Sequence, residues 1–599
     1  MVVLSSREIA ADYAERLRKY QAAVDSEQVQ FRRIGNARLA AGISAAILAF
    51  FVFGSVAVPI YWLAVPIGLF LILVILHARV VQRLQRARRS VRFYESAVAR
   101  IEDRWMGSGE QGERFRNPNH VYAEDLDLFG KGSLYQLLCT VRTRSGEDQL
   151  AAWLLFPAVP EQVKRRQRAI GELAPRVDLR EELALAGEDV QAGLHADKVS
   201  QWGLGPPVSF PPGLRILAVF LSAGTIASLI GYFAGFTGRI PLLVFVLVQM
   251  GVSLALRSRV KSVVEAVELP SHDLGLLSAM IGRIEREGVQ APLLTDLKNR
   301  LVTLGLPAAR QIARLERYAT RLEWSHNEFF KPFAAVMMWS THLAVAIEAW
   351  RRQSGPGIPV WIDATGEFEA LSALACYRYE HPSDIFPELD CSRVVFDVEQ
   401  IGHPLLPEQQ CVRNDIAFGS TLPLVIISGS NMSGKSTMLR TVGLSTVLAW
   451  AGAPVRARKM VLSPVQVAAS IRVQDSLQDG RSRFYAEITR LRQIVDLTSG
   501  QLPVLFLLDE LLSGTNSHDR EIGAAAIVGS LIERGAVGFL TTHDLALAHI
   551  ATSVQPAGVN VHFVDTIEEG KLHFDYQLHP GVVERSNALE LMRSVGLEV

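Results

Sequence analysis

A glycine-containing loop within residues 422–436, LPLVIISGSNMSGKS, has the residue types and spacing that bind phosphate. Gly429, Gly434, Lys435 and Ser436 fit the pattern G-x-x-x-x-G-K-[ST]. Phosphate oxygens need several converging backbone N–H groups, and glycine permits the tight turns that bring those groups together. The lysine ammonium would reach the β- and γ-phosphates of a nucleotide, and the serine hydroxyl would bind Mg²⁺. The loop therefore predicts a nucleotide site rather than a chance glycine turn.

Two segments further along the chain end in residues that would complete such a site. The apolar segment 504–508 ends in Asp509 and Glu510, an acidic pair typical of a Walker B site. Asp509 would hold Mg²⁺ directly or through water, and Glu510 would polarise the attacking water. The apolar segment 537–540 is followed by His543, which resembles the histidine of ABC-type ATPases that senses the γ-phosphate. Alone, an acidic pair more often caps a helix and a histidine is usually structural. The prediction of a nucleotide site therefore depends on finding both together with the glycine loop.

Strands and a helix must position these side chains. The apolar segment 424–427 predicts a buried strand that breaks into the glycine loop, and a helix opens at Ser436. The positive end of that helix would face the bound anion. The segments 504–508 and 537–540 predict further buried strands. Together they predict an α/β P-loop ATPase domain of the ABC type with ATP and Mg²⁺ as cofactors.

Composition limits the remaining possibilities. The 599 residues are enough for about three to five domains. The 61 basic and 61 acidic residues cancel, so overall charge does not predict nucleic-acid binding, although a local basic groove stays open. The four cysteines are scattered without a C-x-x-C pair, which fits a reducing compartment and predicts no metal site built from cysteine.

Two uncharged segments near the N-terminus predict a transmembrane hairpin. Residues 39–58 and 60–76 carry no charge and meet at Pro59. Each is about long enough to cross the hydrocarbon core, which takes ~20 residues. A pair of buried core helices is the alternative, and the lack of any polar face disfavours it. The following segment 79–92 contains six arginines and no acid, so it marks the cytoplasmic side and can contact anionic lipid.

A second pair of uncharged segments predicts another hairpin. Residues 216–236 and 240–256 flank a tip near Gly238, and basic residues follow at 257, 259 and 261. The positive-inside rule places residues 1–38, 79–215 and 257–599 in the cytoplasm and both tips outside. The sequence thus predicts a multi-pass inner-membrane protein with a cytoplasmic ATPase domain. Gly231 and Gly235 form a G-x-x-x-G, a candidate face for helix packing.

The segment 262–350 is charged, with apolar residues at helical spacing at Leu297, Leu301 and Leu304, and predicts a helical lever that ends at residues 355–359. The predicted organisation is an N-terminal helix at 1–38, a first transmembrane hairpin at 39–78, a basic helix and linker at 79–114, a first core module at 115–206, a second transmembrane hairpin at 207–260, an all-α lever with a second core module at 261–400, and the ATPase domain at 401–599.

The predicted ATPase domain resembles the MutS family. The segments that carry the resemblance are GHP at 402–404, NDI at 414–416, SGSNMSGKST at 428–437, DGRSRFYAE at 479–487, LLDELLSGTNSHD at 507–519, TTH at 541–543 and the C-terminal HPGVVERSNALELMRSVGL. The Asn-Met pair is far more specific to this family than a generic P-loop. Residues 133–157, 274–300 and 367–404 are similar to the family's core, lever and connector regions, so the resemblance covers about 115–206 and 262–599.

The resemblance implies a role for each matching residue. The loop residues that would hold phosphates and Mg²⁺ are Gly429, Asn431, Met432, Ser433, Gly434, Lys435, Ser436 and Thr437. Ser436 and Asp509 would bind the metal, Glu510 would activate water, and His543 would sense the γ-phosphate. Ser482 would reach the γ-phosphate of a partner subunit, which implies a homodimer joined through the ATPase domain. Family members use ATP binding to change how their levers hold DNA.

The sequence also departs from the family. The mismatch-reading domain uses a Phe-x-Glu motif, and the letters Phe93-Tyr94-Glu95 match it, but within an arginine-rich helix rather than a globular domain. We interpret that match as a coincidence. The segment 262–350 leaves little room for a DNA clamp, and no nuclease module is visible. Cys411 stands where the family has an aromatic residue near adenine.

The sequence therefore predicts a membrane-anchored, MutS-like ATPase that hydrolyses ATP at a composite dimer site and acts on DNA, in the manner of mismatch repair by similarity. Its partners would be a second copy of the chain, membrane lipid, DNA and an unidentified protein. The alternatives are a nucleotide-controlled membrane scaffold and an ABC-type ATPase without DNA binding. Transport is disfavoured because Leu512-Ser513-Gly514-Thr515 follows the acidic pair, whereas the LSGGQ motif of a transporter precedes it.

Overall fold

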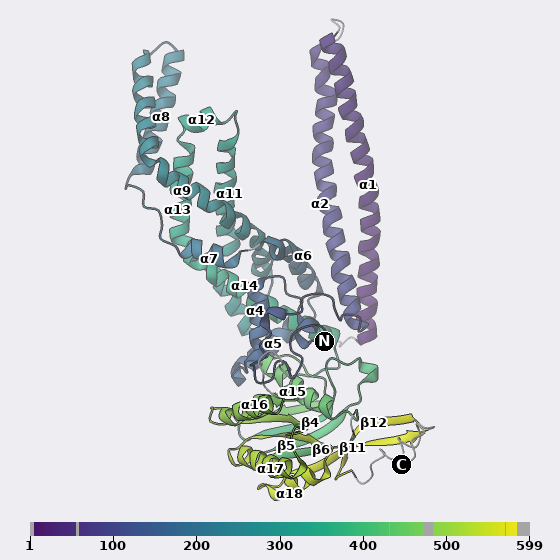
Figure 1. Ribbon diagram of the computed structural model, residues 1–599. Coiled ribbons are helices and arrows are strands. Elements are labelled where there is room, and N and C mark those ends of the chain that lie inside the picture. The colour runs from purple at the N-terminus through teal and green to yellow at the C-terminus, as the bar shows by residue number, and fades with distance from the viewer. Residues whose placement is uncertain are drawn as a thin grey trace. The chain divides into compact units, whose positions relative to one another are not determined.

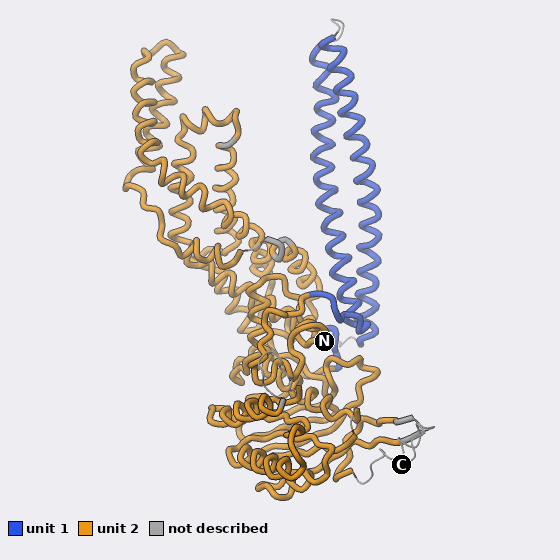
Figure 2. The backbone as a smooth tube through the Cα atoms, in the orientation of Figure 1, with its two compact units in different colours: residues 1–109, 380–383 blue, residues 110–379, 384–599 orange. Residues whose placement is uncertain are grey.

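The computed structural model describes residues 5–54, 59–193, 195–430, 432–472, 483–568 and 571–583 (Figure 1). The chain divides into two compact units, residues 1–109 with 380–383 and residues 110–379 with 384–599 (Figure 2). The division falls at Gly109, inside the polar, glycine-rich segment that separates the basic helix from the following module.

The first unit is a pair of long helices, α1 (Ser6–Gly54) and α2 (Ala64–Ile101), joined through a 3-10 turn at Ile60–Leu63. Each helix runs without a break from its apolar half into its charged half, so the separate segments predicted at 1–38 and 79–114 are continuous with the predicted spans. No proline interrupts α1, and Pro66 lies in the first turn of α2, where proline is tolerated.

Aromatic packing holds the charged halves of the two helices together. The ring of Tyr94 is fully buried, stacks on Tyr20 and meets Tyr13 edge-on. Phe93 is buried beside Tyr94. Glu380, which belongs to the same unit, accepts two hydrogen bonds from Arg100, at 2.7 and 2.8 Å. The rings of the Phe93-Tyr94-Glu95 match therefore serve the packing of this unit, in agreement with a coincidental match.

The second unit contains most of the helices. Their bounds are α3 (Leu134–Leu138), α4 (Arg144–Leu155), α5 (Pro160–Leu173), α6 (Val177–Gly193), α7 (Ala196–Leu204), α8 (Leu214–Phe233), α9 (Arg239–Arg286), α10 (Pro292–Arg300), α11 (Ala308–Glu323), α12 (Lys331–Val336), α13 (Trp339–Ser354), α14 (Ile358–Glu380), α15 (Lys435–Ala451), α16 (Arg483–Leu497), α17 (Ser517–Glu533) and α18 (Ile550–Ser553). The last residue of α14, Glu380, is counted with the first unit.

The helical lever differs from its prediction in two places. Leu297 and Leu301 are buried as expected, but Leu304 is 64% exposed, because the helix ends at Arg300 and the chain turns between the short strands β1 (Val302–Thr303) and β2 (Leu306–Pro307). Residues 355–357 form only a 3-10 turn, after which α14 continues the helical region. Glu369 on the buried helix α14 accepts hydrogen bonds from the backbone N–H of Arg142 and the hydroxyl of Thr143, which joins α14 to the start of α4.

The second predicted hairpin consists of α8 and the first half of α9. Their close approach occurs at Gly224, where an added Cβ would lie 2.3 Å from the ring of Phe245. The G-x-x-x-G at Gly231 and Gly235 does not provide this face, because α8 ends at Phe233 and Gly235 has a φ of 77° in the turn. The helix α9 continues to Arg286, so the boundary predicted at residue 260 falls inside one helix.

Four helical segments in the described parts of the chain are long and apolar enough to cross a membrane: Ser6–Gly54, Ile60–Ile101, Leu214–Phe233 and Arg239–Arg286. They coincide with the four uncharged segments of the sequence. This criterion concerns length and composition only.

Two sheets form the nucleotide domain. A six-stranded sheet has the order β12-β11-β6-β10-β9-β8, and a four-stranded sheet has the order β3-β7-β4-β5. The strands are β3 (Glu388–Leu389), β4 (Val395–Ile401), β5 (Asn414–Gly419), β6 (Leu424–Ser428), β7 (Lys459–Leu462), β8 (Gln466–Ser470), β9 (Val504–Asp509), β10 (Val537–Thr542), β11 (Val559–Glu568) and β12 (Lys571–Pro580). Since β3 and β4 pair with β7 and β5, this domain begins before the predicted residue 401.

The central strands β6, β9 and β10 of the larger sheet are buried on both faces, which explains why they are nearly continuous apolar runs. Strands β8, β9, β10, β6 and β11 are parallel, and β12 is antiparallel at the edge. Phe506 and Leu508 pack in one cluster with residues of α16, α17 and α18, whereas the intervening Leu507 approaches Gly443 of α15 on the other face. The predicted α/β fold of this domain is confirmed.

Candidate nucleotide site

The carboxyl ends of three neighbouring strands bring the predicted site together. Strand β10 lies between β6 and β9, with Thr542 in register with Ser428 and Thr541 in register with Asp509. Because the strands are parallel, the glycine loop after β6, the acidic pair at the end of β9 and His543 after β10 emerge at the same sheet edge. Residues spread over more than a hundred positions thus meet in one place.

The glycine loop has the backbone geometry that a phosphate cradle requires. Gly429 and Gly434 have φ values of 154° and 105°, and Gly434 is the N-cap of α15. Met432 has a φ of 74°, which is rare for a side-chain-bearing residue and marks local strain of the kind found at binding sites. Its side chain is 85% exposed, so it contributes through backbone rather than through contact. Asn431 lies outside the described residues.

Lys435 is held inside the loop. Its Nζ donates to the carbonyl oxygens of Gly429 and Ser430, both at 2.8 Å, and lies 4.0 Å from a carboxylate oxygen of Glu510. Burial lowers the pKa of Lys435, and the neighbouring carboxylates oppose that shift. The ammonium therefore lies inside the loop, where phosphate oxygens of a nucleotide could replace the two carbonyl oxygens as its acceptors.

Ser436 and Asp509 form the predicted metal pair. The hydroxyl of Ser436 donates to Asp509 Oδ2 at 2.5 Å, and Thr541 donates to the other carboxylate oxygen. A carboxylate and a hydroxyl with the oxygens of a phosphate chain are the ligands that Mg²⁺ takes in such sites. Within the described ranges no group of three or more His, Cys, Asp or Glu residues could hold a metal by itself, so the ion would depend on the nucleotide.

Glu510 and His543 face one another beside this pair. His543 Nδ1 lies 3.4 Å from Glu510 Oε1, and both side chains are partly exposed. The backbone N–H of Glu510 contacts the hydroxyl of Thr541 at 3.2 Å, and Glu510 has a φ of 46°. The strand end thus turns the carboxylate toward the loop, where a water attacking a terminal phosphate would have to stand.

The residues present fit a magnesium nucleotide. The hydroxyl of Ser433 is buried and has no hydrogen-bond partner among the described residues, and the hydroxyl of Ser430 shares that property. Both belong to the loop that would surround the phosphates. Thr437 is exposed at the start of α15. An anion bound at the loop would accept hydrogen bonds from these hydroxyl groups and from the backbone N–H groups at the N-terminus of α15.

The composite-site residue Ser482 lies outside the described residues, and the description resumes at Arg483. Directly beyond it in the chain, α16 carries Glu487, a buried carboxylate that accepts a hydrogen bond of 2.6 Å from the backbone N–H of Leu512. Leu512 stands in the turn after the acidic pair. The last residue of the family-like segment, Glu487, therefore contacts the turn after the acidic pair. Glu487 received no role from the sequence, although it closes that segment.

Asp125 is a functional candidate that the sequence patterns did not reveal. Its buried carboxylate accepts hydrogen bonds from the backbone N–H groups of Ile471 and Arg472 at 2.7 and 2.8 Å. Arg440, on the same helix as Lys435, donates to its backbone carbonyl at 3.0 Å. Burial raises the pKa of Asp125, and the two hydrogen bonds oppose that shift. One residue of the core module thus contacts both the P-loop helix and the segment that leads to Ser482.

An aromatic ring also lies at the loop. An added Cβ at Gly434 would stand 3.2 Å from the ring of Tyr576 on β12, and this ring is 42% exposed. Asn414 donates to the backbone carbonyl of Tyr576 and accepts from Leu578 N–H, which ties β12 to β5. The ring lies far along the sequence from the loop, in a stretch where no motif indicates a contact with the nucleotide site.

Comparison with known proteins agrees with this geometry. Residues 425–598 match the family model for MutS domain V. A MutS2 endonuclease of Thermus thermophilus is 32% identical over 253 residues, which are 40% of this chain and 31% of the relative. A DNA mismatch repair protein MutS of Natronomonas pharaonis is 32% identical over 239 residues, 39% of this chain and 27% of the relative. In each case the chain matches less than a third of the relative's length.

Proposed function

We propose that the chain is a membrane-anchored ATPase of the MutS family that acts on DNA, because residues 425–598 match the MutS domain V model and the similar proteins are MutS and MutS2. It binds and hydrolyses ATP with Mg²⁺ at a composite site between two copies of the chain. The observation that supports hydrolysis best is the meeting of Lys435, the Ser436–Asp509 pair and Glu510 at one sheet edge.

Each side chain has a distinct task in this proposal. Lys435 exchanges its two loop carbonyls for phosphate oxygens, and Ser436 with Asp509 holds the metal. Glu510 accepts a proton from the attacking water, and His543 at 3.4 Å keeps that carboxylate oriented. Mg²⁺, when bound, neutralises charge that develops on the phosphates. The exposed ring of Tyr576 offers a stacking surface for a base where Cys411 has none.

Membrane anchoring is the second element of the proposal. It is supported by the four long apolar helices and by basic residues at their predicted cytoplasmic ends. In this arrangement the lever and the ATPase domain are cytoplasmic, and the protein is a multi-pass protein of the inner membrane.

DNA is the proposed substrate by relation to the named relatives, a DNA mismatch repair protein and MutS2 endonucleases. One observation favours the alternative of a nucleotide-controlled membrane scaffold, or an ABC-type ATPase without DNA binding. The rings of Phe93 and Tyr94 are buried, so the Phe-x-Glu letters supply no ring for stacking on a mismatch. We therefore propose action on DNA without recognition of mismatches by that motif.

The test measures ATP hydrolysis by the full-length protein in lipid nanodiscs, without DNA and with perfect, mismatched and branched duplexes. Lys435→Ala protein prepared in parallel reports contaminating activity. We expect magnesium-dependent hydrolysis that changes on addition of at least one DNA. Hydrolysis that no DNA alters, together with no DNA binding in a direct assay, would support the scaffold instead. Failure of the full-length protein to float with vesicles would overturn the anchoring.

A further inference from the structure

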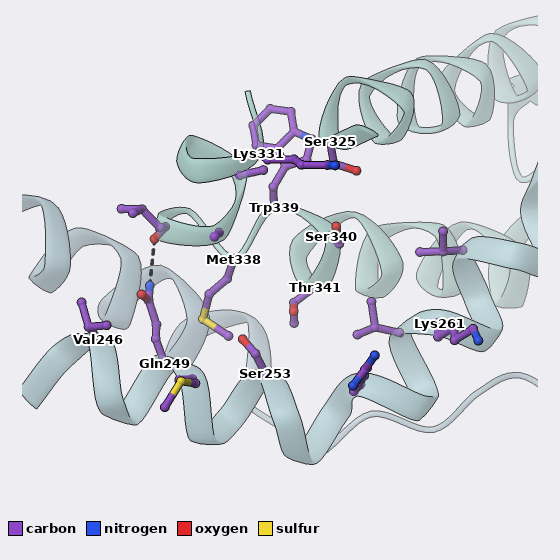
Figure 3. Close-up of a pocket in the computed structure, with 17 residues that line it drawn as sticks. Val246, Gln249, Ser253, Lys261, Ser325, Lys331, Met338, Trp339, Ser340 and Thr341 are labelled. Atoms are coloured by element: carbon purple, nitrogen blue, oxygen red, sulfur yellow. Dashed lines mark hydrogen bonds between the residues drawn. The ribbon is translucent and has the colours of Figure 1, made fainter. Parts of the chain in front are cut away.

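A groove of about 670 Å³ lies between α9 and the segment formed by α12 and the start of α13 (Figure 3). This volume is within the usual range for small-molecule sites, about 300–1,000 Å³. All of its lining belongs to the second unit and lies far along the chain from the nucleotide site. We propose that this groove binds one anionic phospholipid from the surrounding membrane, an inference that rests on the proposed membrane anchoring.

The groove spans the depth that one lipid leaflet would occupy. Its lining on α9 runs from Val246, inside the uncharged segment 240–256, to Arg257 and Lys261 just beyond it. At ~1.5 Å per residue, Val246 and Arg257 are about 16 Å apart along the helix, close to half of the ~30 Å hydrocarbon thickness. The apolar end therefore matches an acyl chain, and the basic end matches a headgroup.

A buried hydrogen bond places α12 at the same depth. Gln249 donates through Nε2 to the carbonyl oxygen of Val336 at 2.8 Å, the interaction drawn as a dashed line from Gln249 in Figure 3. Gln249 is 6% exposed and stands in the middle of the uncharged segment. Backbone carbonyls at membrane depth need such partners, because lipid tails supply none. A helix end that the sequence pattern assigns to the lever therefore belongs to the membrane region.

The surface of that segment has the character of a membrane interface. Trp324, Phe329 and Phe333 are 52%, 96% and 57% exposed, and Phe330 packs between Trp324 and Trp339. Exposed aromatic rings gather at the boundary between lipid and water. The segment that leads into α12 therefore lies at this boundary, whereas the last residue of α12, Val336, lies deeper, beside Gln249.

Charge selects an anionic headgroup. Arg257, Lys261 and Lys331 line the groove, and none of its lining residues is acidic. Lys331 pairs with Glu328 and Lys261 lies 3.6 Å from Glu265, both on the solvent side and outside the lining. Exposed pairs of this kind are weak and exchange readily. The hydroxyls of Ser253 on α9, and of Ser325 and Ser340 on the opposite side of the groove, add donors for phosphate or glycerol oxygens (Figure 3).

The test is the retention of phosphatidylglycerol by the purified, delipidated full-length protein, measured by native mass spectrometry as lipid is added. The double variant Arg257→Gln, Lys261→Gln should bind it about tenfold to thirtyfold more weakly. Arg259→Gln is the control for each single variant, because it removes one positive charge between Arg257 and Lys261 but is not in the lining; its guanidinium donates to the carbonyl oxygen of Ser209 instead, and the variant should stay within about twofold of wild type. Ser253→Trp, which fills the groove between its apolar and basic ends, should lose the lipid while keeping all cations.

Several results would contradict the proposal. Equal retention of phosphatidylcholine by the wild-type protein would show that charge does not select the ligand. Equal effects of Arg259→Gln and the double variant would show general membrane attraction rather than a site. If the wild-type protein is a dimer in the mass spectrum and Ser253→Trp makes it a monomer, the groove serves dimerisation. Flotation of wild-type protein with vesicles is measured in parallel, so that a failure of anchoring is distinguished from a failure of the groove.

Discussion

Replacement of Asp125 by leucine removes the acceptor that holds the segment leading to Ser482. The carboxylate accepts from the backbone N–H groups of Ile471 and Arg472 at 2.7 and 2.8 Å. Each orphaned donor costs about 1–3 kcal/mol if it stays buried. Ile471 is only partly buried and Arg472 is exposed, so water relieves some of that cost. We expect about 2 kcal/mol to be lost from the positioning of this segment.

That loss corresponds to a fall of about thirtyfold in the rate of ATP hydrolysis, if the segment must be in place in the transition state. ATP affinity should change by less than about threefold, because Lys435 and Ser436 are untouched. The assay is steady-state hydrolysis with nucleotide binding and thermal unfolding measured on the same preparation. Asp125→Asn keeps an acceptor oxygen and should recover some of the rate.

Glu124→Gln is the control, since Glu124 is the neighbouring residue and its carboxylate forms an ion pair with Arg116 at 2.8 Å near the surface. Such a pair contributes about 0–1 kcal/mol, and hydrolysis should stay near the wild-type rate. If folded Asp125→Leu protein hydrolyses ATP within about twofold of wild type, the contact does not position the catalytic segment and the reasoning is refuted.

Three further outcomes are expected. Mixing Ser482→Ala with Lys435→Ala protein should rebuild one intact site per heterodimer and raise hydrolysis above either variant, whereas verified heterodimers without recovery would contradict a site in trans. Burial raises the pKa of Glu369 to about 7 from an ordinary 4.5, so its contribution to stability is present below pH 4.5 and declines as the pH rises through 7. Glu369→Gln should flatten that decline in the melting temperature. An unchanged pH profile of the melting temperature would contradict this role of Glu369. A cysteine at Gly238, where a Cβ meets no atom within 4 Å, should react with an impermeant reagent outside the cell while the exposed native Cys391 stays protected, and reversed labelling would invert the topology.

Local patterns in the sequence were sufficient to predict the strands that bring the candidate nucleotide-site residues to one sheet edge. Continuous apolar runs ending in polar residues predict buried strands, and Leu424–Ser428 and Val504–Asp509 form them. The loop spacing then determines which side chains meet at the sheet edge. The uncharged segments likewise predict the long apolar helices, because length and the lack of charge are properties of a single segment.

Contacts between distant segments were not predictable in this way. In the sequence, Asp125 is a single acidic residue outside any recognised motif, and its partners Ile471 and Arg472 are more than three hundred residues away. Gln249 reads as one polar residue in an apolar run, with nothing to indicate Val336 as its partner. Leu304 kept the helical spacing, but the following Gly305, with a φ of 71°, permits the turn that exposes it.

The most direct test of the nucleotide site is ATP turnover by full-length Glu510→Gln protein beside wild type, with nucleotide binding measured on both. The amide keeps the shape of the side chain but cannot accept the proton of the attacking water. We expect wild-type protein to hydrolyse ATP with Mg²⁺, and the variant to bind ATP as tightly while its rate falls at least about a hundredfold. Hydrolysis by Glu510→Gln at the wild-type rate would contradict the assignment of this sheet edge as the catalytic site.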